Sequence, residues 1–431
     1  MNNHLEGEDM NMNDINNVKI KIDKQMKITS FGGYFIVNKI MKQLGLKELF
    51  GTGLGLKVRE RNFKEIDYIN SVIANLMTNG IYVSDIDRLK GDITFQNYAG
   101  FERGVPGGNA VVKYFSKADE SSVEKMKSIN FETGRRIINE MRKNNKSFGR
   151  KIYVFMDSSE IEVTGDQIEG AERNYNGDKS LRIHWIYFED FIIGGDLYSS
   201  SHFVTYGWRE LLDNLSKMTD LLDSEIHIFM DSAYYDYDII HYIEEHDWTY
   251  TITMKHNESL IEDADALAES SWADDYSDFD YYSEREKSFR RVIVRRIEKE
   301  EPDLFGKYNY GFIITNSKES PKSVYETHSL KMGMENNFKH LLIDFNLHHP
   351  RFLSLTSNQL YYQLAILSYH LIKAIQYLYL DGHYFFMRVR RFISHFILIA
   401  GKLIKHSREK IINLIRYPYD EKRLRRIVMM C

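Results

Sequence analysis

The tetrapeptide Phe-Met-Asp-Ser occurs twice in this sequence, at 155–158 and 229–232, and each copy ends a short apolar run. The runs, 151–156 and 225–230, are rich in β-branched and aromatic residues, which predicts two strands with Asp157 and Asp231 at their C-terminal ends. In open α/β sheets that edge binds ligands. Two neighbouring carboxylates resist joint ionisation unless a cation lies between them. The pair therefore predicts a divalent metal site, whereas either aspartate alone would be explained more simply as a turn or capping residue.

A third acidic residue, Glu335, lies in a segment with helical periodicity at 329–342. On such a helix His328, Lys331, Glu335 and Lys339 fall on one face, and a separate apolar stripe faces the protein. A third carboxylate among cations suits a site that holds metal ions beside a polyanionic substrate. The simpler alternative is a solvated face on which the lysines pair with Glu335, where each pair is worth only about 0.3–0.5 kcal/mol.

Taken together, these motifs resemble the DDE transposases of bacterial insertion sequences, specifically the insertion-sequence 1380 group of the insertion-sequence 4 superfamily. The resemblance covers nearly the whole chain. The matching segments are 29–33, 43–46, 84–89, 107–115, 156–159, 165–171, 175–176, 231–235, 315–316, 335–339, Asp344, 358–359 and 393–418.

The resemblance implies that Asp157, Asp231 and Glu335 are the catalytic residues and also the ligands of two Mg²⁺ ions, with Mn²⁺ as a substitute. It implies an endonuclease that cleaves the transposon ends and then joins their 3′-hydroxyls to target DNA, which is cut-and-paste DNA transposition. The implied partners are double-stranded DNA, as terminal inverted repeats and target, and a second copy of the chain in a synaptic homodimer.

The sequence departs from the superfamily pattern beside the third acid. The superfamily motif would place Tyr, Arg and Lys where this chain has His328, Lys331 and Leu342. Lys331 keeps the positive charge but loses the planar fork with which arginine grips phosphate. Lys339, one turn before Leu342, matches another lysine of the narrower group. We therefore expect His328, Lys331 and Lys339 to contact DNA.

Arg135 and Arg136 are two further DNA-contact candidates. They belong to the stretch 131–151, which carries seven basic and two acidic residues and so suits a surface facing phosphates. A solvated helix face explains the same charges equally well.

Periodicity and charge predict the organisation of the chain. Strands with intervening helices predict an α/β protein flanked by helical N- and C-terminal regions, and the resemblance implies that its core is an RNase H-like catalytic domain. The expected parts are a disordered tail (1–26), a helical DNA-binding domain (27–150), the catalytic domain (151–380) with a β-rich insertion at about 256–318, and a basic helical region (381–431). Trp272 in the insertion could stack on a flipped base, but a tryptophan of the insertion core is the simpler explanation.

The composition fits a DNA-binding enzyme when the uneven distribution of charges along the sequence is considered. The net charge is −5, yet 385–431 holds twelve basic and three acidic residues. The only cysteine is Cys431, which excludes an intramolecular disulfide and a cysteine metal cluster. No apolar run reaches the roughly 20 residues of a membrane span, so we expect a cytoplasmic, nucleoid-associated protein. Two alternatives stay open: a catalytically silent relative that only regulates through DNA binding, and a nuclease of the same fold that does not join DNA.

Overall fold

The computed structural model describes residues 27–51, 53–57, 62–144, 146, 148–165, 167–174, 176–188, 191–284, 287–303, 306–385, 387–406, 409–414 and 421–430. Within these ranges the side chains at 301–303, 306, 334–340, 383, 405–406, 409–410, 428 and 430 are not described. The expected tail, 1–26, lies outside the described residues.

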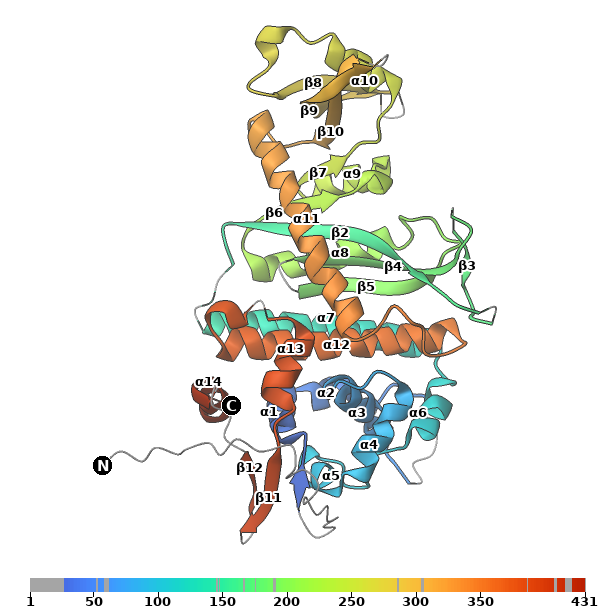
Figure 1. The fold of residues 1–431 in the computed structure, drawn as a ribbon, viewed down its shortest axis with the longest axis vertical. Helices are drawn as coiled ribbons and strands as arrows, with labels where there is room; N and C mark the ends of the chain where they lie inside the picture. Colours follow the sequence, from blue (N-terminus) through green and yellow to red (C-terminus); the bar gives the residue numbers. More distant parts are fainter. Residues whose placement is uncertain are drawn as a thin grey trace, which may run out of the picture.

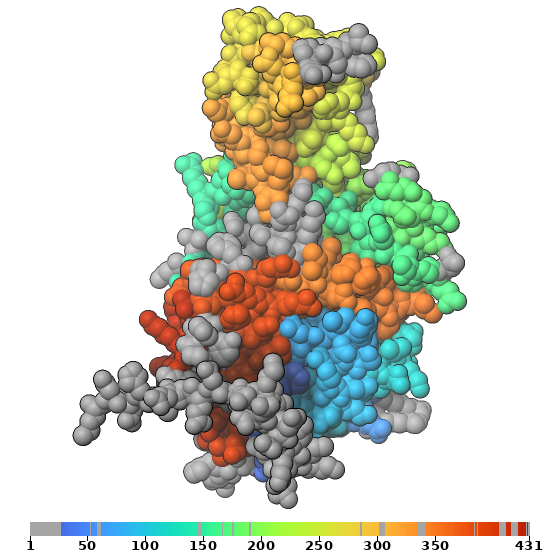
Figure 2. Space-filling view, in the orientation of Figure 1, coloured from blue at the N-terminus to red at the C-terminus, as the bar shows by residue number. Residues whose placement is uncertain are grey.

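The molecule is elongated and layered (Figure 1). A helical region forms one end. The long helices α7 (Glu120–Lys143) and α12 (Leu355–Tyr379) lie next to it, a large sheet follows, and the strands β8 to β10 form the far end. The space-filling view shows the chain's N- and C-terminal parts packed together at the first end, while residues of β8 and β9 protrude at the other (Figure 2).

The N-terminal region is helical apart from the two-residue strand β1 (Ile28–Thr29). Its helices are α1 (Phe35–Gln43), α2 (Leu46–Phe50), α3 (Glu65–Leu76), α4 (Ile86–Gly91), α5 (Ile93–Ala99), α6 (Gly108–Phe115) and α7 (Glu120–Lys143). Side-chain caps explain two of the starts: Asp92 accepts a bond from Phe95 N before α5, and Asp119 accepts one from Ser122 N before α7.

The central sheet is mixed and has nine strands in the described part of the chain. They are β2 (Lys151–Glu162), β3 (Glu172–Arg173), β4 (Lys179–Phe188), β5 (Phe191–Ser199), β6 (Glu225–Met230), β7 (Thr249–Thr253), β8 (Tyr276–Ser283), β9 (Ser288–Asp303) and β10 (Gly306–Thr315). The order is β3-β4-β2-β6-β7-β10-β9-β8, and β5 also pairs with β4. Only the β2–β6 and β6–β7 pairs are parallel. Helices α8 (Trp208–Leu222), α9 (Tyr237–Glu245) and α10 (Glu258–Asp265) connect the strands from β5 to β8.

The strands of the expected insertion extend this sheet and do not form a separate one. β10 pairs antiparallel with β7, with Ile314 opposite Ile252, and β9 and β8 follow outward. The segment is therefore rich in strands, as expected, but these strands continue the edge of the central sheet.

Two long helices follow the sheet, α11 (Pro321–Asp344) and α12 (Leu355–Tyr379). Nearly every residue of α12 is buried, because α7 runs alongside it, β5 packs on one side of it and the N-terminal helices α1 and α3 pack on the other (Figure 1). Gln363 of α12 shows how the layers are joined. Asn130 Nδ2 of α7 donates to its Oε1 at 2.8 Å, while its own Nε2 donates to the carbonyl of Gly195 on β5 at 2.7 Å.

The prediction that the chain stays helical to its end is wrong. After α13 (Val389–Phe392) the chain forms a hairpin, β11 (Gly401–His406) and β12 (Glu409–Leu414), before α14 (Glu421–Met430). β1 pairs with β11, so the N-terminal strand completes a three-stranded sheet. The physical reason is long-range: Gly32 N donates to Ile399 O at 2.7 Å, and glycine at 32 and 401 lets the two backbones approach closely. Local periodicity cannot reveal such a pairing.

Candidate active site

The two aspartates are brought side by side by the register of neighbouring strands. β2 and β6 pair in parallel from Lys151 opposite Glu225 to Phe155 opposite Phe229. Asp157 and Asp231 each follow the last pair of this register by two residues, so both come directly after the same end of the parallel pairing. Asp231 follows Met230, the last residue of β6, and keeps an extended backbone with φ −87° and ψ 178°.

One expectation about this pair needs correction. Asp157 does not end its strand, because β2 continues to Glu162 through its antiparallel pairing with β4, where Asp157 lies opposite Trp185. Only the pairing with β6 stops before Asp157. The strand end that the sequence predicted is therefore present on the β6 side of Asp157 alone.

Backbone amides fix one oxygen of each carboxylate. Ser158 N donates to Asp157 Oδ1 at 2.9 Å, and Ala233 N donates to Asp231 Oδ1 at 2.9 Å. The second bond caps a short 3-10 turn, Ser232–Tyr234, directly after β6. The capping role that a lone aspartate would have is thus real for Asp231, and it orients the carboxylate as well.

Tyr234 shows independently that the carboxylates converge. Its side chain is fully buried, and burial raises the pKa of its hydroxyl well above the ordinary value. The negative charges of Asp157 and Asp231 raise it further, while the Ser158 side chain and Arg182 oppose the shift. Both aspartates therefore act on one hydroxyl, which stays protonated and can serve only as a neutral neighbour to them.

The adjacent His184 adds no positive charge. Its ring lies 5.4 Å from that of Tyr234, and burial lowers its pKa to about 4. Its Nδ1 contacts the carbonyl oxygen of Tyr206 at 2.7 Å, so a neutral ring must carry its proton there. The neutral His184 therefore does not offset the negative charge of Asp157 and Asp231. Carboxylate oxygens are hard donors, which fit Mg²⁺.

The third predicted acid lies on α11, whose backbone runs past the sheet (Figure 1). The side chains of Glu335 and Lys339 lie outside the described residues, so the structure does not test their roles. Among the side chains it does describe, no group of three or more His, Cys, Asp or Glu residues could hold a metal ion.

Comparison with known proteins gives the family. The family model described as "Transposase DDE domain group 1" matches residues 12–430. The chain belongs to this DDE transposase family. A solved structure, the cryo-EM synaptic complex of piggyBac transposase with hairpin DNA, is similar with a TM-score of 0.45 and 12% identity, over 84% of this chain and 78% of that one. No curated protein matches the sequence.

Within this DDE transposase family member, His328 faces the sheet. Its Nδ1 contacts Thr251 Oγ1 at 2.8 Å, and its Nε2 contacts Thr253 Oγ1 at 2.9 Å. Burial, and secondarily the charge of Lys331, lower its pKa to about 4. Lys331 itself is only 9% exposed. The sequence placed both residues among the DNA contacts, and the structure gives His328 partners inside the protein.

The two arginine candidates also have partners in the described protein. Arg136 Nη1 donates to the carbonyls of Leu44 and Gly45 at 2.7 and 3.0 Å, which ties α7 to the turn between α1 and α2. Arg135 lies 3.7 Å from Glu132, and its side chain is 40% exposed. Of the two, Arg135 has the more accessible charge.

Sequence reasoning missed the threonines of β7 and the buried Tyr234. The alternation Thr249, Thr251, Thr253 was the available signal, because residues two apart share one face of a strand. Trp272, considered for base stacking, is half-buried, and the Arg296 guanidinium lies 4.5 Å from its ring.

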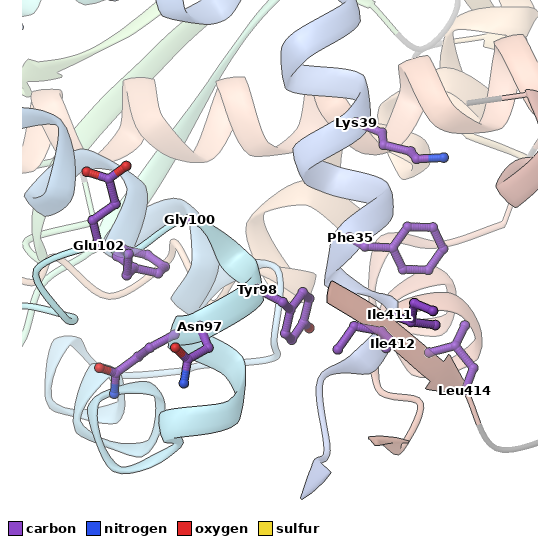
Figure 3. A pocket seen from close by; sticks show the side chains of 11 residues that line it. Phe35, Lys39, Asn97, Tyr98, Gly100, Glu102, Ile411, Ile412 and Leu414 are labelled. Atoms are coloured by element: carbon purple, nitrogen blue, oxygen red, sulfur yellow. The ribbon is translucent and has the colours of Figure 1, made fainter. Parts of the chain in front are cut away.

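A cavity of about 860 Å³ lies in a different layer, between α1, α5 and β12 (Figure 3). Phe35, Tyr98 and Leu414 line it, and Glu102 is its one acidic lining residue. It therefore lacks the paired carboxylates that distinguish the β2–β6 edge. No helix in the described part of the chain is long and apolar enough to cross a membrane.

Proposed function

We propose that this protein catalyses cut-and-paste DNA transposition as a member of the insertion-sequence 1380 group. Membership of the DDE transposase family supports the class of reaction. The single observation that carries the proposal is the parallel pairing of β2 with β6 up to Phe155 opposite Phe229, two residues before Asp157 and Asp231. The strand order β5-β4-β2-β6-β7, with three antiparallel and two parallel strands, supports an RNase H-like core.

We assign Asp157, Asp231 and Glu335 as the ligands of two Mg²⁺ ions. Such ions, when bound, acidify water and stabilise charge on the attacked phosphate. The backbone amides of Ser158 and Ala233 hold the carboxylates in orientation. Tyr234 and neutral His184 lie on the protein side of the site, and neither contributes a positive charge to it.

The proposed substrates are double-stranded DNA, first as the element's ends and then as target. Lys331, Lys339 and Arg135 are the candidates for phosphate contacts. Joining two ends requires two catalytic centres in one complex, so we propose a homodimer in the synaptic state. The basic segment 385–431 supports DNA as the partner.

The test is cleavage and joining of DNA carrying the element's own ends, with and without Mg²⁺. We expect wild type to cleave and join only with metal. Asp157→Asn should abolish both steps while retaining DNA binding. Asp220→Asn is the matched control, because Asp220 is an exposed aspartate of α8. Binding without cleavage by wild type would favour the silent regulator, and cleavage without joining would favour the nuclease.

A further inference from the structure

A chain of hydrogen bonds joins β6, β7 and α11 beside the aspartate pair. Thr249 Oγ1 donates to the carbonyl of Ile226 at 3.1 Å and contacts His227 Nδ1 at 2.8 Å. His227 Nε2 lies 3.2 Å from Thr251 Oγ1, which also contacts His328 Nδ1 at 2.8 Å. The chain ends with His328 Nε2 and Thr253 Oγ1 at 2.9 Å.

Burial lowers the pKa of His227 to about 3 and that of His328 to about 4, so both rings are neutral, and the carbonyl at the start of the chain then fixes the direction of every bond. Thr249 donates its one hydroxyl proton to that carbonyl, so its oxygen must accept from His227 Nδ1–H. His227 Nε2 then accepts from Thr251, which in turn accepts from His328 Nδ1–H. Thr253 finally donates to His328 Nε2. Both neutral histidines therefore carry their protons on Nδ1.

Packing sets His328 close to the aspartates. Its ring centroid lies 5.9 Å from that of Phe229, which stands two residues before Asp231. Along α11, His328 precedes Glu335 by seven residues, close to two helical turns, so the two backbone positions fall in one row. A bond that fixes the rotation of the helix at 328 therefore also fixes the rotation of its backbone at 335.

We propose that His328 is a positioning residue which, clamped between Thr251 and Thr253, sets the rotation of α11 so that Glu335 completes the metal site with Asp157 and Asp231. This inference rests on the proposed function and departs from the DNA-contact role expected from the sequence. Both ring nitrogens are already engaged by threonines. Burial also lowers the pKa of His328 to about 4, with Lys331 on α11 and the neutral His227 on β6 as the titratable groups near it.

The first experiment reads the imidazole directly in the full chain labelled with ¹⁵N-histidine. A clamped His328, identified by loss of its signal in His328→Asn, should stay in the neutral Nδ1–H form on both sides of about pH 6.5, the ordinary histidine pKa. Its signal should not change when a DNA duplex is added. Protonation near the ordinary value, or a shift on adding DNA, would overturn the clamp.

The second experiment measures Mn²⁺ binding by calorimetry without DNA. His328→Ala should weaken binding by about tenfold, the lower end of the effect of removing supporting residues around a metal site. Thr253→Val should weaken it in the same direction at lower risk to folding. His328→Asn should retain most of the affinity, because its amide can still donate to Thr251. Ser329→Ala, an exposed neighbour bonded only to its own helix at Tyr325, is the control.

The outcomes separate the two proposals. Mn²⁺ affinity in His328→Ala equal to that of Ser329→Ala would overturn the positioning role and leave the transposase function standing. No Mn²⁺ binding and no cleavage by wild type, with the neutral tautomer still observed, would instead overturn the proposed metal-dependent function.

Discussion

Phe155 and Phe229 stack with their ring centroids 4.8 Å apart, and each stands two residues before an aspartate of the candidate site. Because side chains alternate along a strand, each phenylalanine and its aspartate share a face. Phe155 also stacks on Tyr187 of β4 at 5.4 Å. The stacked rings of Phe155, Phe229 and Tyr187 thus form an apolar floor beside the two aspartates and help to keep β2 and β6 in register.

Replacing Phe229 with leucine tests this floor. We expect the free energy of unfolding to fall by about 1–1.5 kcal/mol, since an aromatic pair is worth about that much beyond its buried area. Mn²⁺ affinity should fall as well, because the strands can shift relative to each other. Phe188→Leu is the control: Phe188 is equally buried among Phe148 and Phe191, away from the aspartates. Equal loss of Mn²⁺ affinity in both variants would contradict the proposed floor.

Removing one charge of the pair should stabilise the protein when no metal is present. Two carboxylates on adjacent strands repel, so Asp231→Asn should raise the free energy of unfolding in EDTA by about 0.5–1 kcal/mol. Saturating Mg²⁺ should stabilise wild type and leave the variant unchanged, because only wild type binds it. Urea titrations with and without Mg²⁺ measure both effects. A variant less stable than wild type in EDTA would contradict the proposed repulsion, because asparagine keeps the capping bond from Ala233 N through its own Oδ1.

Lys127 and Asp196 form a buried ion pair between α7 and β5, with 2.8 Å between Nζ and Oδ2. Burial raises the pKa of Asp196 to about 6, against the opposing charge of Lys127. A raised pKa means that the folded state holds its proton more tightly than the unfolded chain. The stability this group contributes is therefore fully present below about pH 4 and is lost as pH rises through 6.

Lys127→Met should make that dependence steeper. At pH 8 it leaves a buried carboxylate without its cation, which should lower the free energy of unfolding by about 3–5 kcal/mol. Near pH 5 the loss should be smaller, since a protonated Asp196 needs no cation. The double variant Lys127→Met/Asp196→Asn should recover most of the stability at pH 8. A loss that does not vary with pH would indicate that packing, not charge, is responsible.

Gly33 tests the contact between the chain's N- and C-terminal parts. A Cβ there would overlap the carbonyl oxygen of Phe396, a backbone atom that cannot move aside alone. Gly33→Ala should therefore lower the melting temperature and expose the hairpin β11–β12 to proteolysis. Gly91→Ala is the matched control, because its Cβ would meet nothing within 4 Å at the end of α4. It should change stability by less than about 1 kcal/mol, in the stabilising direction.

The repeated Phe-Met-Asp-Ser motif follows two strands, β2 and β6, that pair in parallel with Phe155 opposite Phe229, so equivalent residues of the two copies lie at the same level of the sheet. The continuation of β2 beyond Asp157 could not be predicted, since it depends on β4 as a partner. His328 lay on the predicted face of its helix, but only the position of β7 shows that this face meets threonines at that point. The hairpin of β11 and β12 was missed for the same reason: its partner, β1, lies at the other end of the sequence.

The pairing of β1 with β11 has a consequence for how this protein is made. The backbone hydrogen bond of Gly32 cannot form until Ile399, about 370 residues later, has been synthesised. At about 5–20 residues per second a ribosome needs roughly 20–70 s to supply that partner. During this interval the first helices emerge without the strands that cover them. The N-terminal region therefore cannot complete its contacts with the hairpin of β11 and β12 until about 370 further residues have left the ribosome.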